Sequence, residues 1–106
     1  MNGSIAGLFA APKGGVPKPL VQSLQVTFDG CVGDFQRDKK YHGGPQRAVC
    51  LFSEEVITLL QAEGHPVHPG SVGENILLRE VDWKMIAIGS TFHFDELILE
   101  VTSDAP

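Results

Sequence analysis

The sequence predicts a small, mainly β domain, a barrel with one or two attached helices. Three observations lead to this prediction. Short apolar segments of strand length recur along the 106 residues, clusters of glycine and proline separate them, and only one segment has clear helical spacing. With 42% hydrophobic and 20% charged residues, the chain has enough apolar material for a packed core. We expect a single domain over residues 1–106.

The first half of the chain contains two predicted strands and a long loop. The strands are "SIAGLF" (Ser4–Phe9) and "LVQSLQVTF" (Leu20–Phe28), and the loop between them holds three prolines and two glycines. Apolar and polar residues alternate along the second segment, as they do in a half-buried strand. Residues 29–46 follow and are too polar and too rich in glycine for a regular element. Long loops of this kind are often functional.

The one segment with helical spacing comes after a short strand candidate at residues 48–52. Ser53 is the expected N-cap, and acidic residues in the first turn, Glu54 and Glu55, complement the helix dipole. Four residues follow helical spacing: Val56, Leu59, Leu60 and Glu63. Gly64 is the expected end of this helix.

Further strands are predicted after the helix. Residues 74–78 form one strand, and residues 90–103 form a hairpin around the acidic turn Asp95-Glu96. Residues 82–89 are compatible with a short helical turn or with an extended segment. No internal repeat is visible. Because strands dominate and most connections are short, a small barrel fits the pattern best.

The charge of the chain and its lack of long apolar runs exclude several kinds of partner. The net charge of −5 and the pI near 5.2 argue against nucleic acid or an anionic membrane as a partner. No apolar run approaches the ~20 residues that span a bilayer, and the N-terminus lacks the regions of a signal peptide, so we expect a cytoplasmic protein.

The two cysteines, Cys31 and Cys50, are too few for a disulfide framework and lack the CxxC spacing of zinc and redox sites. Each is expected to be a reduced, partly buried thiol, although Cys31 could be exposed in its glycine-rich loop.

The stretch "KKYHGGPQRAV" is the first candidate site. Gly43 and Gly44 can leave backbone amides open to an anion, but two glycines alone are more often ordinary loop residues. Arg47 offers a fork of donors for a phosphate or carboxylate, and His42 can donate, accept or transfer a proton near neutral pH. Further cations nearby, each of which taken singly is more often a solvated loop residue, are Arg37, Lys39 and Lys40. Together these residues predict an anionic small-molecule ligand.

The stretch "PGSVGENI" is the second candidate site. Gly70 and Gly73 permit a tight backbone path, Glu74 can orient a neighbouring His or Arg, and Asn75 can bind a ligand ring. The alternative is that Glu74 and Asn75 tie down the turn through local backbone hydrogen bonds, and the sequence does not separate these readings. Surface positions are expected for three histidines: His65, His68 and His93.

Taken together, these stretches resemble the MOSC domain, named for the C-terminal domain of molybdenum cofactor sulfurase. The resemblance covers nearly the whole chain, from "SIAGLF" to "LILEVTS". The matching residues are Gly33, Asp34, His42, Gly43, Gly44, Arg47, Gly73, Glu74 and Asn75. The resemblance implies a β-barrel that binds the molybdenum cofactor, a molybdopterin. The implied cofactor-binding residues are Lys39, His42, Gly43, Gly44, Arg47, Glu74 and Asn75.

In characterised branches, the resemblance implies reduction of N-hydroxylated compounds or sulfuration of the cofactor. A small oxidoreductase of this type would need a separate electron-donor protein, because no flavin, haem or iron–sulfur motif is visible. The alternative is a non-catalytic module that binds or carries a cofactor or another anion. Nothing in the resemblance leads us to expect pyridoxal phosphate.

The chain departs from the MOSC pattern at the metal ligand. Members that hold molybdenum use a cysteine thiolate shortly after the strand that here reads "LILEVTS", a position that would follow Pro106. Neither Cys31 nor Cys50 occupies it, so the catalytic residue is unknown. We expect the domain either to be incomplete relative to the family or to complete its sheet with a partner chain, for example in a homo-oligomer.

Overall fold

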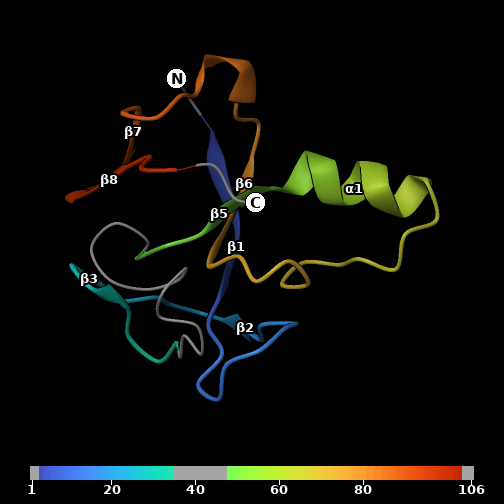
Figure 1. Cartoon of the computed structure of the whole chain (residues 1–106), viewed down its shortest axis with the longest axis horizontal. Coiled ribbons are helices and arrows are strands. Elements are labelled where there is room, and N and C mark those ends of the chain that lie inside the picture. The colour runs from blue at the N-terminus through green and yellow to red at the C-terminus, as the bar shows by residue number, and fades with distance from the viewer. Residues whose placement is uncertain (1–2, 35–47, 104–106) are drawn as a thin grey trace.

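The computed structural model describes residues 3–34 and 48–103. Its elements, in chain order, are β1 (Ser4–Phe9), β2 (Leu20–Val21), β3 (Val26–Thr27), β4 (Gly30–Cys31), β5 (Leu51–Ser53), α1 (Glu54–Ala62), β6 (Ile76–Arg79), a 3-10 helix η1 (Trp83–Met85), β7 (Thr91–Phe94) and β8 (Leu97–Glu100) (Figure 1). The predicted class, a mainly β chain with a helix attached, is confirmed. Within the described ranges, no helix combines the length and apolar character needed to cross a bilayer.

A four-stranded sheet in the order β2-β1-β6-β5 forms the centre of the molecule. β1 is antiparallel to β2 and β6, whereas β5 is parallel to β6, with α1 in the connection between them. Three successive residues of β6, Ile76, Leu77 and Leu78, are buried. Such a continuous apolar run is typical of a strand covered on both faces. Because β6 is held on both sides and on both faces, the residues immediately before it in the chain are held in place as well.

The described strands do not close the predicted barrel. β3 pairs with β4 and β7 pairs with β8 in two separate two-stranded sheets. In Figure 1 the β7–β8 hairpin and α1 lie on opposite sides of the central sheet. The β7–β8 hairpin itself was predicted correctly, and Phe92 in it packs against Trp83 with ring centroids 6.0 Å apart.

The single strand predicted over Leu20–Phe28 is wrong. The chain bends at Gln22, so β2 joins the central sheet while β3 turns back onto β4. Two contacts tighten this second hairpin: Val32 N donates to Gln25 O at 2.8 Å, and Thr27 Oγ1 donates to Gly30 O at 2.9 Å. The apolar and polar alternation runs through the bend, and it therefore gives no local sign of the break.

Both ends of the helix agree with the sequence prediction, but the residue that it buries is not among the four noted for helical spacing. Ser53 Oγ accepts a hydrogen bond from Val56 N at 3.2 Å, and Gly64 follows the helix with φ of 92°. The residue that α1 buries is Ile57, which packs with Phe9 and Leu77 in the core cluster. Leu59, on the predicted face, is 58% exposed.

The cause of this orientation lies at the start of α1. The helix begins directly after β5, and Arg79 at the end of β6 pairs with Glu54 in the first turn, with Nε and Oε1 2.7 Å apart. The direct connection from β5 sets the side of the helix that faces the sheet, and the exposed ion pair adds little to it. Helical spacing alone does not contain that information.

Candidate functional site

The structure describes part of the predicted site. Five of the predicted cofactor-binding residues lie outside the described residues: Lys39, His42, Gly43, Gly44 and Arg47. Their roles stay predictions. The described matches to the family pattern are Gly33, Asp34, Gly73, Glu74 and Asn75. Of these, Asp34 and Asn75 meet directly, at the end of the central sheet where β6 begins.

Asn75 connects three segments of the chain. Its side chain is buried, and its Nδ2 donates to Phe9 O at 3.1 Å and to Asp34 Oδ2 at 2.8 Å. Its Oδ1 accepts from Cys50 N at 3.0 Å. The backbone of Asn75 binds two of the same residues, since its N donates to Cys50 O and its carbonyl accepts from Phe9 N, both at 2.8 Å. Asn75 is thus fixed between the end of β1 and the start of β5.

Asp34 forms a buried ion pair with Lys18. Lys18 Nζ lies 2.7 Å from Asp34 Oδ2, and the two side chains are only 8% and 1% exposed. The other carboxylate oxygen, Oδ1, accepts from Ala11 N at 2.8 Å. Burial by itself would raise the pKa of Asp34, but these hydrogen bonds and the Lys18 ammonium outweigh it and hold the pKa below its ordinary value. Asp34 is therefore ionised at neutral pH, and its charge is balanced by Lys18.

Lys18 is the residue of this site that sequence analysis missed. It lies between two prolines in the loop after β1, where a lysine is ordinarily solvent-exposed. Its backbone N donates to Gly70 O at 3.0 Å, which fixes this loop against the turn that precedes β6. No local pattern marks it, because its partners are distant in sequence.

Glu74 is tied to the same turn. It is 0% exposed, and its Oε2 accepts from Gly70 N at 2.9 Å. Gly70 has φ of 93°, and a Cβ at this position would clash with Lys18 O, so the turn requires glycine. The other oxygen, Oε1, is buried and has no hydrogen-bond partner within residues 3–34 and 48–103. The described bond of Glu74 is the local backbone bond that the sequence allowed as one alternative, whereas the bonds of Asn75 are long-range.

Comparison with known proteins assigns the family. A family model described as the MOSC domain matches residues 38–106. The chain belongs to the MOSC domain family. Protein YiiM of Escherichia coli (strain K12) is 33% identical over 85 residues, covering 74% of this chain and 37% of that protein. The uncharacterised protein YflK of Bacillus subtilis (strain 168) is 27% identical over 86 residues, covering 80% of this chain and 39% of that protein.

The chain therefore spans about two-fifths of the length of these curated MOSC relatives. A solved structure titled as that of a hypothetical protein superposes with a TM-score of 0.67 at 24% identity. The match covers 94% of this chain and 43% of that one. At this level of identity the similarity shows a shared fold.

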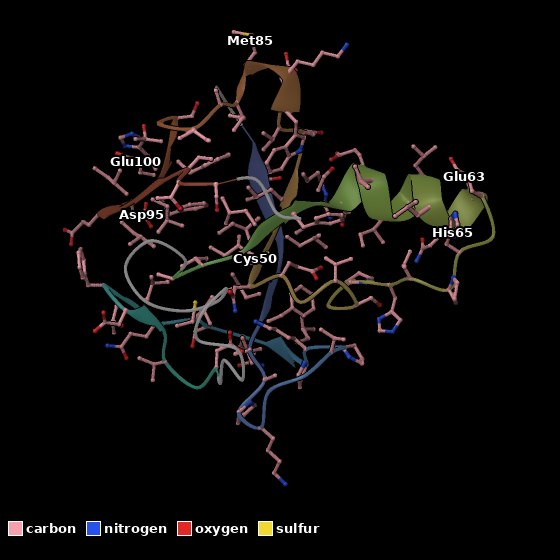
Figure 2. The ribbon with its side chains drawn as sticks, in the orientation of Figure 1. Cys50, Glu63, His65, Met85, Asp95 and Glu100 are labelled. Atoms are coloured by element: carbon pink, nitrogen blue, oxygen red, sulfur yellow. The ribbon has the colours of Figure 1, made fainter. Side chains whose placement is uncertain are left out.

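Neither thiol of this MOSC chain occupies the position at which the family pattern places the metal-binding cysteine. Both are free, and Cys50 lies at the centre of the molecule, beside the start of β5 (Figure 2). Burial, followed by the charge of Asp34, raises the pKa of Cys31 from 9.0 to about 11, and burial also raises the pKa of Cys50. Cys31 is 8% exposed, which agrees with the expected buried thiol and not with the exposed position that its loop also allowed. With no metal ion beside them, both thiols are therefore protonated at neutral pH.

The described histidines do not complete a metal site either. His65 and His93 are exposed, as predicted, and His65 lies at the far end of α1 from Cys50 (Figure 2). His68 is also exposed, with Nδ1 3.0 Å from Pro69 O. Across residues 3–34 and 48–103, no group of three or more His, Cys, Asp or Glu side chains could hold a metal ion.

We expect Cys31 to react slowly with iodoacetamide in the folded protein. A pKa of about 11 instead of 9.0 corresponds to about 100-fold less thiolate at pH 8. Labelling followed by mass spectrometry should therefore show Cys31 at least that much slower in buffer than in concentrated urea. Equal rates in the two solvents would contradict the protonated, buried state described for this thiol.

Proposed function

We propose that this chain forms part of a MOSC-type protein that binds the molybdenum cofactor and reduces N-hydroxylated compounds. One observation carries the proposal. Asp34 and Asn75, which match the family pattern but are distant in the sequence, meet in one buried polar cluster beside the segment that contains the "HGG" motif. Buried polar groups are costly unless they are paired, and a paired cluster of this kind holds the residues around it in place.

In this proposal the cationic stretch binds the anionic part of the cofactor. Arg47 and Lys39 would bind its phosphate, the backbone amides of Gly43 and Gly44 would approach it closely, and His42 would donate a hydrogen bond or a proton. Glu74 Oε1, which lacks a described partner, fits a donor such as a ring N–H or a bound water. Neither Cys31 nor Cys50 is assigned as the molybdenum ligand, because neither lies at the position after "LILEVTS" where the family pattern places that cysteine.

When bound, the cofactor would supply two-electron redox chemistry. Reduction of an N-hydroxyl group consumes two electrons and two protons and releases water, leaving the corresponding amine or imine. The electrons require a separate electron-donor protein, and we propose the cytoplasm as the compartment. A homo-oligomer is compatible with the open sheet edges of the described strands.

Metal and pterin content test the proposal. The chain should be expressed in a host that makes the molybdenum cofactor and, as the matched control, in a strain that does not. Purified protein from the first host should contain molybdenum by mass spectrometry and a pterin that fluoresces after oxidation, and protein from the second should contain neither. Absence of both from the first preparation would overturn the proposal.

The alternative is a module that binds the cofactor, or another anion, without catalysis. It is favoured by the sequence pattern, because neither Cys31 nor Cys50 occupies the position after "LILEVTS" at which the family places the metal-binding cysteine. It predicts bound pterin but no turnover of an N-hydroxylated compound when a chemical reductant replaces the donor protein. Turnover under these conditions would decide in favour of the oxidoreductase.

Replacing Arg47 by alanine should weaken retention of the cofactor. A hydrogen bond to a charged group contributes about 1.5–3 kcal/mol, which corresponds to a release roughly 10- to 150-fold easier. Bound pterin can be measured by fluorescence after extensive dialysis. Arg79→Ala is the matched control, since Arg79 is exposed and pairs with Glu54 on the outside of α1. If Arg47→Ala retains as much pterin as the control, Arg47 is a structural residue.

A further inference from the structure

A pocket lies where the loop between β1 and β2 meets the turn before β6. Its volume is about 590 Å³, within the range of small-molecule sites in proteins. Phe9, at the end of β1, lines the pocket and is only 3% exposed, so it lies at the base. The structure describes every residue of the wall, and the apolar ones are Ala6, Phe9, Pro17, Pro19, Leu20 and Pro69.

Main-chain hydrogen bonds hold the walls of this pocket together. Lys18 N donates to Gly70 O at 3.0 Å, which joins the loop to the turn. Ala10 N donates to Pro19 O at 3.2 Å, and β2 is paired with β1. Because the walls are already fixed, a ligand does not have to order them, and this lowers the entropic cost of binding.

The lysine in the wall does not offer a free positive charge. Lys18 Nζ lies 2.7 Å from Asp34 Oδ2, and the Lys18 side chain is 8% exposed. An anionic ligand would have to compete with a buried carboxylate for this ammonium, and a charged ligand of either sign would lose its hydration among apolar side chains. The charges of the wall therefore favour an uncharged ligand.

His68 is the other residue of the wall with a polar side chain, and one of its ring nitrogens is already bound. Nδ1 lies 3.0 Å from Pro69 O. A carbonyl oxygen can only accept, so Nδ1 carries the proton, and in the neutral ring Nε2 is then an acceptor. Within residues 3–34 and 48–103, Nε2 has no hydrogen-bond partner. This nitrogen can therefore accept one hydrogen bond from a ligand.

We propose that this pocket binds an uncharged, largely apolar small molecule that carries one hydroxyl or N–H group. The apolar wall takes the body of the molecule, and the hydroxyl or N–H group donates to His68 Nε2. The inference goes beyond the proposed function and does not depend on it, because binding to this pocket needs no cofactor.

Three naphthalene probes of similar size test the chemical class of the ligand. 2-Naphthol carries a hydroxyl donor, 2-methoxynaphthalene lacks the donor, and 2-naphthoate carries a negative charge. Binding to the full chain is measured by NMR from the amide signals of Lys18, Leu20 and His68, in buffer near pH 8, above the range in which histidines ordinarily take up a proton.

We expect 2-naphthol to bind about 2- to 10-fold more tightly than 2-methoxynaphthalene, the effect of one hydrogen bond between neutral groups. 2-Naphthoate should bind most weakly, because the Lys18 ammonium is already paired. Failure of 2-naphthol to shift these amide signals, or tightest binding by 2-naphthoate, would overturn the proposal.

His68→Phe separates the hydrogen bond from the apolar contact. Phenylalanine keeps an aromatic ring at this place but has no nitrogen, so 2-naphthol and 2-methoxynaphthalene should bind this variant with equal affinity. His65→Phe, the same change at another exposed histidine that does not line the pocket, should leave the difference between the two probes intact. An undiminished difference in His68→Phe would overturn the role of Nε2.

Leu20→Ala tests the place of binding. Leu20 lines the pocket and is 72% exposed, so its truncation should change the stability of the fold little but weaken the binding of all three probes severalfold. Leu59→Ala, the same change at a leucine of α1 that is 58% exposed, should leave the three affinities unchanged. Equal losses in the two variants, or no loss in Leu20→Ala, would mean that the probes bind elsewhere and that the proposal is wrong.

Discussion

Replacing Lys18 by methionine is expected to lower the free energy of unfolding by about 3–5 kcal/mol, the cost of removing one partner from a buried ion pair. Methionine fills much of the space of the lysine chain but removes the ammonium that lies 2.7 Å from Asp34 Oδ2, and the Asp34 side chain is only 1% exposed. Urea unfolding followed by circular dichroism would measure the loss. Lys84→Met, the same change at an exposed lysine, should alter stability by no more than about 0.5 kcal/mol.

The effect of Lys18→Met should depend on pH in a defined direction. The pKa of Asp34 is lowered in the folded protein, so the pair contributes stability above the carboxyl's pKa in the unfolded chain and loses it as pH falls through the lowered folded value. The two proteins should therefore differ most at neutral pH and least in acid, where Asp34 is protonated in both. A difference that stays constant from pH 7 to pH 3 would contradict the charge-based explanation.

Leu77→Ala should cause a comparable loss, about 2–5 kcal/mol, for a different reason. Leu77 is 1% exposed, belongs to β6 between β1 and β5, and packs with Phe9 and Ile57. Removing its branched end leaves a cavity in the core cluster. Because β6 is paired with a strand on each side, it cannot easily move to fill that cavity. Thermal or urea unfolding would measure the change.

Leu59→Ala is the matched control for this substitution. Leu59 follows helical spacing on α1, yet it is 58% exposed, so its truncation removes little buried surface and keeps a strong helix former. We expect a change within about 0.5 kcal/mol. A loss of stability as large as that of Leu77→Ala would mean that Leu59 is buried and that the described orientation of α1 is wrong.

Local signals explain which parts of the fold the sequence could predict. Ser53 and Gly64 mark the ends of α1 because capping depends on a few neighbouring residues. The β7–β8 hairpin is equally local, since its strands are joined by a short turn. The bend at Gln22 and the burial of Ile57 depend on contacts with distant segments, so neither alternation nor helical spacing reveals them.

The same distinction applies to the candidate site. Asp34, Glu74 and Asn75 could be singled out because they belong to short motifs that resemble a known family. Their mutual arrangement, and in particular the bond from Asn75 to Asp34, follows from the pairing of β1, β6 and β5 and is not visible in either motif. Lys18 belongs to no motif, and its pairing with Asp34 emerges only when the loop after β1 folds against the turn before β6.

Some of the residues that hold Asn75 in place lie before the region that the family model matches. The family model starts at residue 38, but β1, Lys18 and Asp34 all precede it. A fragment cut at that boundary would lose the antiparallel neighbour of β6 and would leave Asn75 without its partners at Phe9 and Asp34. Any fusion, graft or minimal version of this domain therefore has to include β1, because residues 38–106 lack the strand and the side chains that hold Asn75 in place.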